Sequence, residues 1–258
     1  MIEITELKTY GWEEAIRGMR NSYNSWDKCD SEFDIICRIC DRTDVTCEDC
    51  VVNAGLTDCI IGPNDLTLMK KLCAAGTDHC KFRRMITVSM DINAPLYWWK
   101  EFDTYKVGTV ANSCSTMHKI AEKEFTMDDF SHEYLIPGFT IRIPVEDGED
   151  EIIPVSDPME SLQKTIDLLN EIRFAYQVFS TEPHRYPTFS AKEIWWQMIQ
   201  LLPSSYNQKR TVMLNYEVLA NIYKSRKNHK LDEWRTFCKI MESTLPYPEL
   251  FTSKGGQA

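Results

Sequence analysis

Four cysteines in the first quarter of the chain have the spacing of a metal site. Cys37 and Cys40 form one Cys-x2-Cys pair, and Cys47 and Cys50 form a second pair after a six-residue gap. A tight turn brings the two thiolates of each pair to one side, and four thiolates satisfy the tetrahedral geometry of zinc. The spacing therefore predicts a structural zinc site, since four protein ligands leave no open position for a substrate.

Other uses of these cysteines stay open. An iron–sulfur cluster also takes four cysteines, and the same side chains could be free thiols. Cys29 and Cys59 flank the two pairs and are alternative ligands. Residues 29–61 show no sustained helical or strand period. We therefore expect a cysteine-rich insertion that is folded by its metal rather than by a core of its own.

The elements that surround this insertion predict a helix-rich α/β (α+β) fold. Helical spacing of apolar residues indicates helices over 12–19, 64–75, 159–180, 191–202 and 231–243. Asn64 and Asn215 are expected to cap helices, the second of which runs to Arg226. Strand patterns cover 83–94 and 211–214, and two short strands flank an acidic turn within 139–155. Pro95 opens a further helix over 96–105.

Composition excludes several classes of function. A net charge of −10 argues against general affinity for duplex nucleic acid, which requires clustered Lys and Arg. No apolar stretch approaches the roughly 20 residues of a membrane-spanning helix. The N-terminus has no signal-peptide pattern, and ten cysteines without such a signal are more typical of thiols or metal ligands than of disulfides. We expect a cytoplasmic protein that binds neither membranes nor nucleic acid.

Three segments resemble the flavin-dependent thymidylate synthase family. Residues 82–95 read as a strand ending in Asn-Ala-Pro, and 96–102 follow where the family has a helix ending in Arg-Gln-aromatic. The family signature, Arg-His-Arg and then Ser-x-Arg after seven residues, falls on Thr104-Tyr105-Lys106 and, with one inserted residue, on Ser115-Thr116-Met117.

The second and third segments lie near the C-terminus. Leu202-Pro203 and Asn215 are spaced as the family's Leu-Pro and helix-capping Asn, and Arg226 follows eleven residues later, where the family keeps an arginine that contacts the nucleotide. Residues 229–233 are similar to the family's His-Ala-Gln-Trp-Glu, with one residue deleted before them.

The resemblance implies a single thymidylate synthase-like domain over 1–258, with FAD, a dUMP-type pyrimidine deoxynucleotide, a folate one-carbon donor and a homotetrameric assembly. It assigns the nucleotide to Arg226, Lys106, Ser115 and Glu101, and the cofactor to Asn215, His229, Asn112 and Tyr105. The alternative is that Asn215 only caps a helix and that Arg226 and His229 are only polar groups at a helix end.

The chain departs from the family where catalysis depends on charge. Thr104 and Met117 stand where the family has arginines, and Glu101 replaces a glutamine. Lys106 keeps one positive charge, and the Lys209-Arg210 pair could replace some of the rest. Guanidinium groups hold phosphates and carbonyls in fixed geometry, so two functions remain: an enzyme of altered activity, or a catalytically inactive nucleotide- or flavin-binding protein. The family pattern favours the enzyme but assigns no catalytic residue.

Overall fold

The described residues form two compact units. The computed structural model describes residues 2–33, 57, 59–115, 119–146, 148–182 and 189–252. The first unit consists of the described parts of Ile2–Asn93, Lys100–Ser113 and Lys209–Ala258, and the second of those of Ala94–Trp99 and Cys114–Gln208. No described helix has the length and apolar character needed to cross a bilayer.

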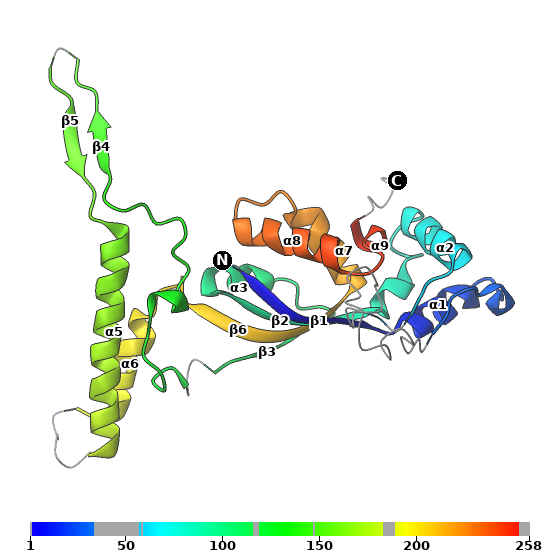
Figure 1. Cartoon of the computed structure of the whole chain (residues 1–258), viewed down its shortest axis with the longest axis horizontal. Helices are drawn as coiled ribbons and strands as arrows, with labels where there is room; N and C mark the ends of the chain where they lie inside the picture. The colour runs from blue at the N-terminus through cyan, green and yellow to red at the C-terminus, as the bar shows by residue number, and fades with distance from the viewer. Residues whose placement is uncertain are drawn as a thin grey trace, which may run out of the picture. The chain divides into compact units, whose positions relative to one another are not determined.

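A four-stranded sheet organises the first unit. Its order is β1 (Glu3–Tyr10), β2 (Thr87–Pro95), β6 (Asn207–Asn215) and β3 (Val110–Ser113), with antiparallel pairing of β1 to β2 and of β3 to β6. Alternate residues of β2, including Val88, Met90 and Ile92, are fully buried. One face of the sheet therefore carries the core, and α7 and α8 lie over a face of it (Figure 1).

Six helices contribute to the first unit. They are α1 (Trp12–Asn21), α2 (Pro63–Ala74), the last residues of α3 (Leu96–Phe102), α7 (Tyr216–Arg226), α8 (Asp232–Thr244) and α9 (Glu249–Thr252). Aromatic rings join them: Trp12 of α1 meets Tyr216 of α7 edge-on, with ring centroids 5.3 Å apart. Such edge-to-face pairs add to the energy of burial itself.

Asn64 does not cap α2, contrary to the prediction. The helix begins one residue earlier at Pro63, with Gly62 as its N-cap and no capping side chain at that position. The Asp30 carboxylate, far away in sequence, instead accepts hydrogen bonds from the backbone N–H groups of Asn64 and Asp65. The backbone N–H groups at the start of the helix thus find their acceptor in a tertiary contact, which the local sequence does not reveal.

A buried ion pair joins α1 to α2. Arg20 Nε donates to Asp65 Oδ1 at 2.6 Å, and the two side chains are 5% and 0% exposed. The other carboxylate oxygen of Asp65 accepts from the Cys29 thiol, the Ser31 hydroxyl and the backbone N–H of Asp30. Every polar atom of the Asp65 carboxylate is therefore hydrogen-bonded, as a buried charge requires.

The two ends of the cysteine-rich segment are held together. Glu32 and Ile60 exchange two backbone hydrogen bonds, of 2.9 and 3.0 Å, in an antiparallel bridge. The predicted ligands Cys37, Cys40, Cys47 and Cys50 lie outside the described residues. Of the alternative ligands, Cys59 is buried and Cys29 donates to Asp65, and burial raises the pKa of the Cys29 thiol. Cys29 and Cys59 as alternative metal ligands stay predictions.

The second unit is built on two packed helices, α5 (Pro158–Thr181) and α6 (Ala191–Leu201). Leu162, Ile166 and Leu169 of α5 are buried, as the helical spacing predicts, and they share a core with Met198 of α6 and Phe130. Trp195 packs against this core, whereas Trp196 is 41% exposed.

A two-stranded hairpin completes the second unit. Strands β4 (Thr140–Ile143) and β5 (Glu151–Pro154) pair antiparallel, with Ile141 opposite Ile153. They match the two short strands predicted on either side of the acidic turn. The mixture of helices with a mainly antiparallel sheet confirms the helix-rich α/β (α+β) class.

Candidate functional site

Arg226 lies at the C-terminal end of α7 and is held by two residues from the α3 region. Its Nη1 donates to Glu101 Oε2 at 2.7 Å, and its Nε donates to the Tyr105 hydroxyl at 3.0 Å. The guanidinium also lies over the Trp234 ring, 5.0 Å from the centroid. Three of the residues named from the family spacing therefore meet, although Arg226 lies more than 120 positions from the other two in the chain.

Glu101 is fixed by donors on one oxygen. Its Oε2 accepts from Arg226 and from the Trp234 indole N–H, the latter at 3.0 Å. Trp234 is fully buried and stacks on Phe102 at 6.2 Å, so this donor cannot move away. Within the described part of the chain, Glu101 Oε1 accepts no hydrogen bond. The side chain is 35% exposed, so an ionised acceptor faces outward beside a guanidinium.

His229 has polar contacts on both ring nitrogens. The backbone N–H of Leu231 donates to Nδ1 at 3.2 Å, and Arg226 Nη1 lies 2.8 Å from Nε2. Arginine is a donor only, so the shorter contact is a hydrogen bond when Nε2 accepts. Nε2 also lies 3.5 Å from Glu101 Oε2, and His229 therefore borders the Arg226–Glu101 pair.

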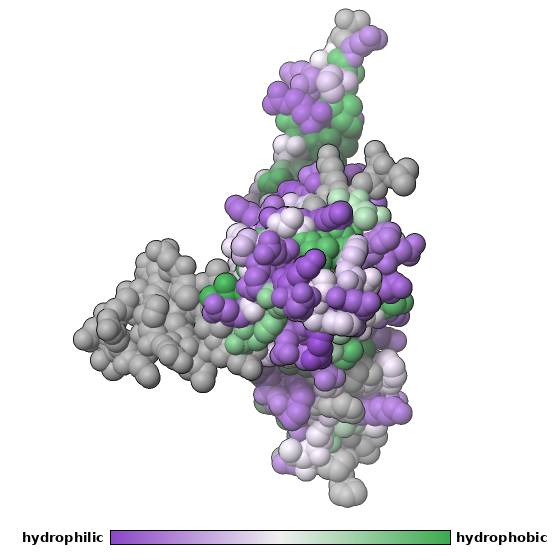
Figure 2. Space-filling model, turned by 90° about the vertical axis from the view of Figure 1, so that its right-hand side faces the viewer, coloured by the Kyte–Doolittle hydropathy of each residue, from purple (hydrophilic) through white to green (hydrophobic). Residues whose placement is uncertain are grey.

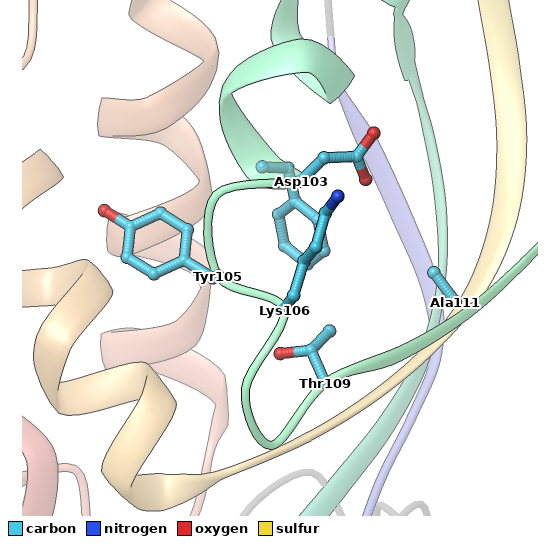
Figure 3. A pocket seen from close by; sticks show the side chains of 6 residues that line it. Asp103, Tyr105, Lys106, Thr109 and Ala111 are labelled. Atoms are coloured by element: carbon cyan, nitrogen blue, oxygen red, sulfur yellow. The ribbon is translucent and has the colours of Figure 1, made fainter.

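A pocket of about 150 Å³ adjoins this cluster. It is lined by Phe102, Asp103, Tyr105, Lys106, Thr109 and Ala111. Figure 3 shows the Lys106 side chain rising beside Asp103, with Thr109 below them and the Tyr105 ring pointing away. The Thr109 hydroxyl is buried without a hydrogen-bond partner among the described residues. An unsatisfied hydroxyl on a pocket wall is suited to a polar ligand group, because leaving it unpaired is costly.

A second ion pair borders this pocket. Arg210 of β6 donates to Asp103 at 2.9 Å, and the two side chains are 15% and 47% exposed. Lys209 points to Asp91 at 2.9 Å instead. Of the two cations suggested as replacements for the lost arginines, Arg210 therefore adjoins the pocket through Asp103.

The remaining predicted residues are placed as follows. Asn215 Oδ1 accepts from the backbone N–H of Val218, so it caps α7 as predicted. Gly108 has φ +80°, in the left-handed region, and a Cβ there would lie 3.1 Å from the Asn215 amide nitrogen. Asn112 is an exposed residue of β3, opposite Thr211. Ser115 belongs to the second unit. These three roles in ligand binding stay predictions.

Both tryptophans of the Trp98-Trp99 pair are core residues. They are 0% and 1% exposed, and the Trp99 indole N–H donates to the Gln208 carbonyl at 2.9 Å. Both side chains are therefore covered, and neither is available to stack on a ligand.

Sequence reasoning missed three residues of this region, Trp234, Asp103 and Thr109, and the ion pair between Asp103 and Arg210. The signal for the ion pair is weak, since Asp103 and Arg210 are 107 residues apart. Trp234 follows the His229–Glu233 motif directly, and a lone indole N–H near a predicted acid could have drawn attention to it. Together these groups present a donor, an acceptor and an aromatic wall, which suits a planar polar ring.

Structural comparison identifies the fold. A structure of thymidylate synthase X (ThyX) from Helicobacter pylori with FAD and dUMP matches 98% of this chain and 97% of its own, at 13% identity and a TM-score of 0.56. A second Helicobacter pylori ThyX complex with FAD and dUMP matches 96% and 97%, at 12% identity and a TM-score of 0.55. A UMP/dUMP methylase, PolB from Streptomyces cacaoi, bound with 5-Br UMP, matches 99% and 94%, at 14% identity and a TM-score of 0.51.

The likeness is one of structure. No protein-family model matches the chain, and no curated protein matches it. At 12–14% identity the shared property is the fold. The chain therefore has the fold seen in the ThyX thymidylate synthases and in the UMP/dUMP methylase PolB.

Proposed function

We propose that this protein binds FAD and a dUMP-type pyrimidine deoxynucleotide and transfers a one-carbon group to the base, with an activity that differs from ordinary thymidylate synthesis. The observation that carries the proposal is the Arg226–Glu101–Tyr105 cluster. Residues named from the family spacing meet in one partly exposed site, and its outward groups are a guanidinium donor and a carboxylate acceptor. Such a pair matches a ring edge that offers both an N–H and a carbonyl.

The groups around the pocket fit part of a phosphorylated ligand. Lys106 offers an ammonium donor and Thr109 a hydroxyl with no partner among the described residues. Asp103 holds Arg210 beside them. Bound flavin would supply a hydride to the reaction. This chain's own residues would orient the nucleotide and hold its base edge, and the buried Trp234 would keep Glu101 in place.

We propose three further features on the family pattern. A folate would donate the one-carbon group, the assembly would be a homotetramer, and the protein would work in the cytoplasm. The nearest support for a pyrimidine nucleotide as ligand is that the similar structures were determined with dUMP or 5-Br UMP.

Conversion of dUMP to thymidine monophosphate is expected to be slow or absent. Thr104 and Met117 stand at family arginine positions, and preorganised cations contribute most where charge develops in a dry site. The protein is supplied with FAD, a reductant, methylene-tetrahydrofolate and dUMP, and the product is measured by mass. A kcat of about 1 per second or more would contradict this expectation and would assign the missing charge to Lys106 or Arg210.

The second candidate is a catalytically inactive nucleotide- or flavin-binding protein. Thr104 and Met117, at family arginine positions, favour it. The two candidates are separated by the purified protein's spectrum and the mass of any co-purifying molecule. A flavin absorption band together with a modified pyrimidine nucleotide supports the enzyme. Colourless protein that binds dUMP in calorimetry, and yields no nucleotide product with any one-carbon donor tested, supports the binding protein.

Zinc is expected at about one equivalent per chain, because Cys37, Cys40, Cys47 and Cys50 have the spacing of a four-thiolate site. Elemental analysis of the purified protein measures it. The double variant Cys37→Ser and Cys40→Ser should lose the metal, whereas Cys238→Ser, a buried cysteine of α8, should keep it. Protein that carries neither zinc nor iron near that ratio would exclude a metal site.

A further inference from the structure

The two oxygens of the Glu101 carboxylate have different surroundings. Oε2 accepts from Arg226 Nη1 at 2.7 Å and from the Trp234 indole N–H at 3.0 Å. Oε1 accepts no hydrogen bond from the residues that the structure describes, and the side chain is 35% exposed. The carboxylate is paired with a guanidinium and ionised, and an ionised carboxylate only accepts hydrogen bonds. Position 101 therefore presents one fixed acceptor to a ligand.

Arg226 places a donor beside this acceptor. Its Nη1 and Nε bond to Glu101 and Tyr105, and Nη2 has no hydrogen bond to a described residue. The Glu101 carboxylate repels a phosphate, whereas the Lys106 ammonium in the adjoining pocket attracts one. The base edge of a bound nucleotide is then the part that meets Glu101 and Arg226. This placement rests on the proposed function, because it takes a pyrimidine nucleotide as the ligand.

Uracil and cytosine both offer a donor beside an acceptor, but in different positions. The ring donor of uracil, N3–H, lies between two carbonyl oxygens, so an ionised acceptor opposite N3–H also meets a carbonyl on the side that Arg226 does not cover. The cytosine amino group stands at the end of its edge, with the acceptor N3 on one side and a C–H on the other. Carboxylates are the side chains that accept from this amino group when proteins read cytosine. An acceptor with one donor beside it therefore matches cytosine better than uracil.

We propose that Glu101 selects a cytosine deoxynucleotide over a uracil deoxynucleotide as the ligand of this site. Glu101 Oε1 accepts from the exocyclic amino group, and Arg226 donates to the ring nitrogen N3. Trp234 is a positioning residue, because its buried N–H holds Oε2 and so leaves Oε1 facing outward. The uracil base is disfavoured by the carbonyl that it would place beside an ionised oxygen.

Glutamine at position 101 would present the opposite group to the base. Arg226 and the Trp234 indole are donors only, so an amide would keep its carbonyl oxygen on them. Its NH2 group would then take the outward position of Oε1. A donor at that position opposes the cytosine amino group, whereas it can bond to a uracil carbonyl. Glu101→Gln therefore tests the contact with almost no change of shape.

The test measures the affinity of the full chain, with FAD added, for dCMP and for dUMP by isothermal calorimetry. The unchanged protein should bind dCMP at least about 5-fold more tightly than dUMP, the lower end of the discrimination that one good base contact gives. Glu101→Gln should bring this ratio to about 1 or below. The control Glu13→Gln makes the same change on α1, at an end of the first unit where hydrophilic side chains predominate (Figure 2), and should leave the ratio unchanged.

A third ligand tests the same contact without a substitution. The deoxynucleotide of 2-pyrimidinone is the cytosine nucleotide without its amino group, and it should bind the unchanged protein at least about 5-fold more weakly than dCMP. The base assignment is overturned if dCMP is preferred less than about 5-fold over either ligand. It is also overturned if Glu101→Gln, with the circular dichroism spectrum of the unchanged protein, leaves the ratio as it was. In both cases binding of dUMP would still support the proposed function, whereas binding of neither dCMP nor dUMP would overturn the two proposals together.

Discussion

Replacement of Arg226 by alanine is expected to weaken dUMP binding by about 1.5–3 kcal/mol, the range for hydrogen bonds to a charged group. Its Nη1 and Nε are held by Glu101 and Tyr105, which fixes the plane of the guanidinium, and among the described residues no hydrogen bond occupies Nη2. The loss of a preorganised donor is therefore larger than the loss of a mobile surface charge. Isothermal calorimetry with dUMP measures the effect.

Two variants separate ligand binding from structural damage. Lys224→Ala removes an exposed charge in the last turn of the same helix and should leave the affinity unchanged. The double variant Arg226→Ala with Glu101→Gln removes the carboxylate that would otherwise lose its partner, and it should bind dUMP no more tightly than Arg226→Ala alone. Unchanged affinity in Arg226→Ala would exclude Arg226 from the site.

Substitution of Asp65 by asparagine is expected to lower the free energy of unfolding by about 3–5 kcal/mol, the usual cost of breaking a buried ion pair from one side. Arg20 would keep its charge at 5% exposure without a counter-ion. Urea unfolding followed by circular dichroism measures the change. Arg17→Ala is the matched control, because Arg17 lies on the same helix and forms an exposed pair with Glu13; it should cost less than about 1 kcal/mol.

The same carboxylate makes stability depend on pH. Burial acts to raise the pKa of Asp65, but hydrogen bonds from Ser31 and Arg20 outweigh it, and the pKa lies below its ordinary value. A carboxyl with a depressed folded-state pKa contributes stability above its unfolded pKa and loses it as the pH falls through the folded pKa. The Asp65→Asn protein should therefore lose less stability on acidification than the unchanged protein. Equal acid sensitivity of the two would contradict this role.

The sequence predicted those elements in which burial follows a regular period. The helices of the second half, α5 to α8, match their apolar spacing. Strand β1 was missed because its register shifts between Thr5 and Lys8, where Glu6 has φ +52°, and the shift breaks the alternation. The predicted strand over 83–94 begins four residues too early, because Lys81–Arg84 form a 3-10 turn with Phe82 and Arg83 both buried. Two adjacent buried residues do not fit a half-buried strand.

The predicted site was located by family spacing rather than by chemistry. Glu101, Tyr105, Arg226 and His229, which the resemblance assigned to ligands, lie in one cluster, and their roles in binding stay predictions. Their hydrogen bonds could not be predicted, because the Trp234 N–H that fixes Glu101 belongs to a separate helix and no local pattern links the two. Nor does the sequence show that Asp103 and Arg210 pair across the sheet. Long-range pairing of this kind depends on the fold as a whole.

The bridge between Glu32 and Ile60 turns the chain between them into a closed loop. Its two ends are joined by backbone hydrogen bonds and anchored beside Asp65 by Asp30 and Ser31. The entropy of closing a loop between fixed ends grows slowly, by about 0.6 kcal/mol for each doubling of loop length. The free energy of closing this loop in the first unit therefore depends only weakly on how many residues the loop contains.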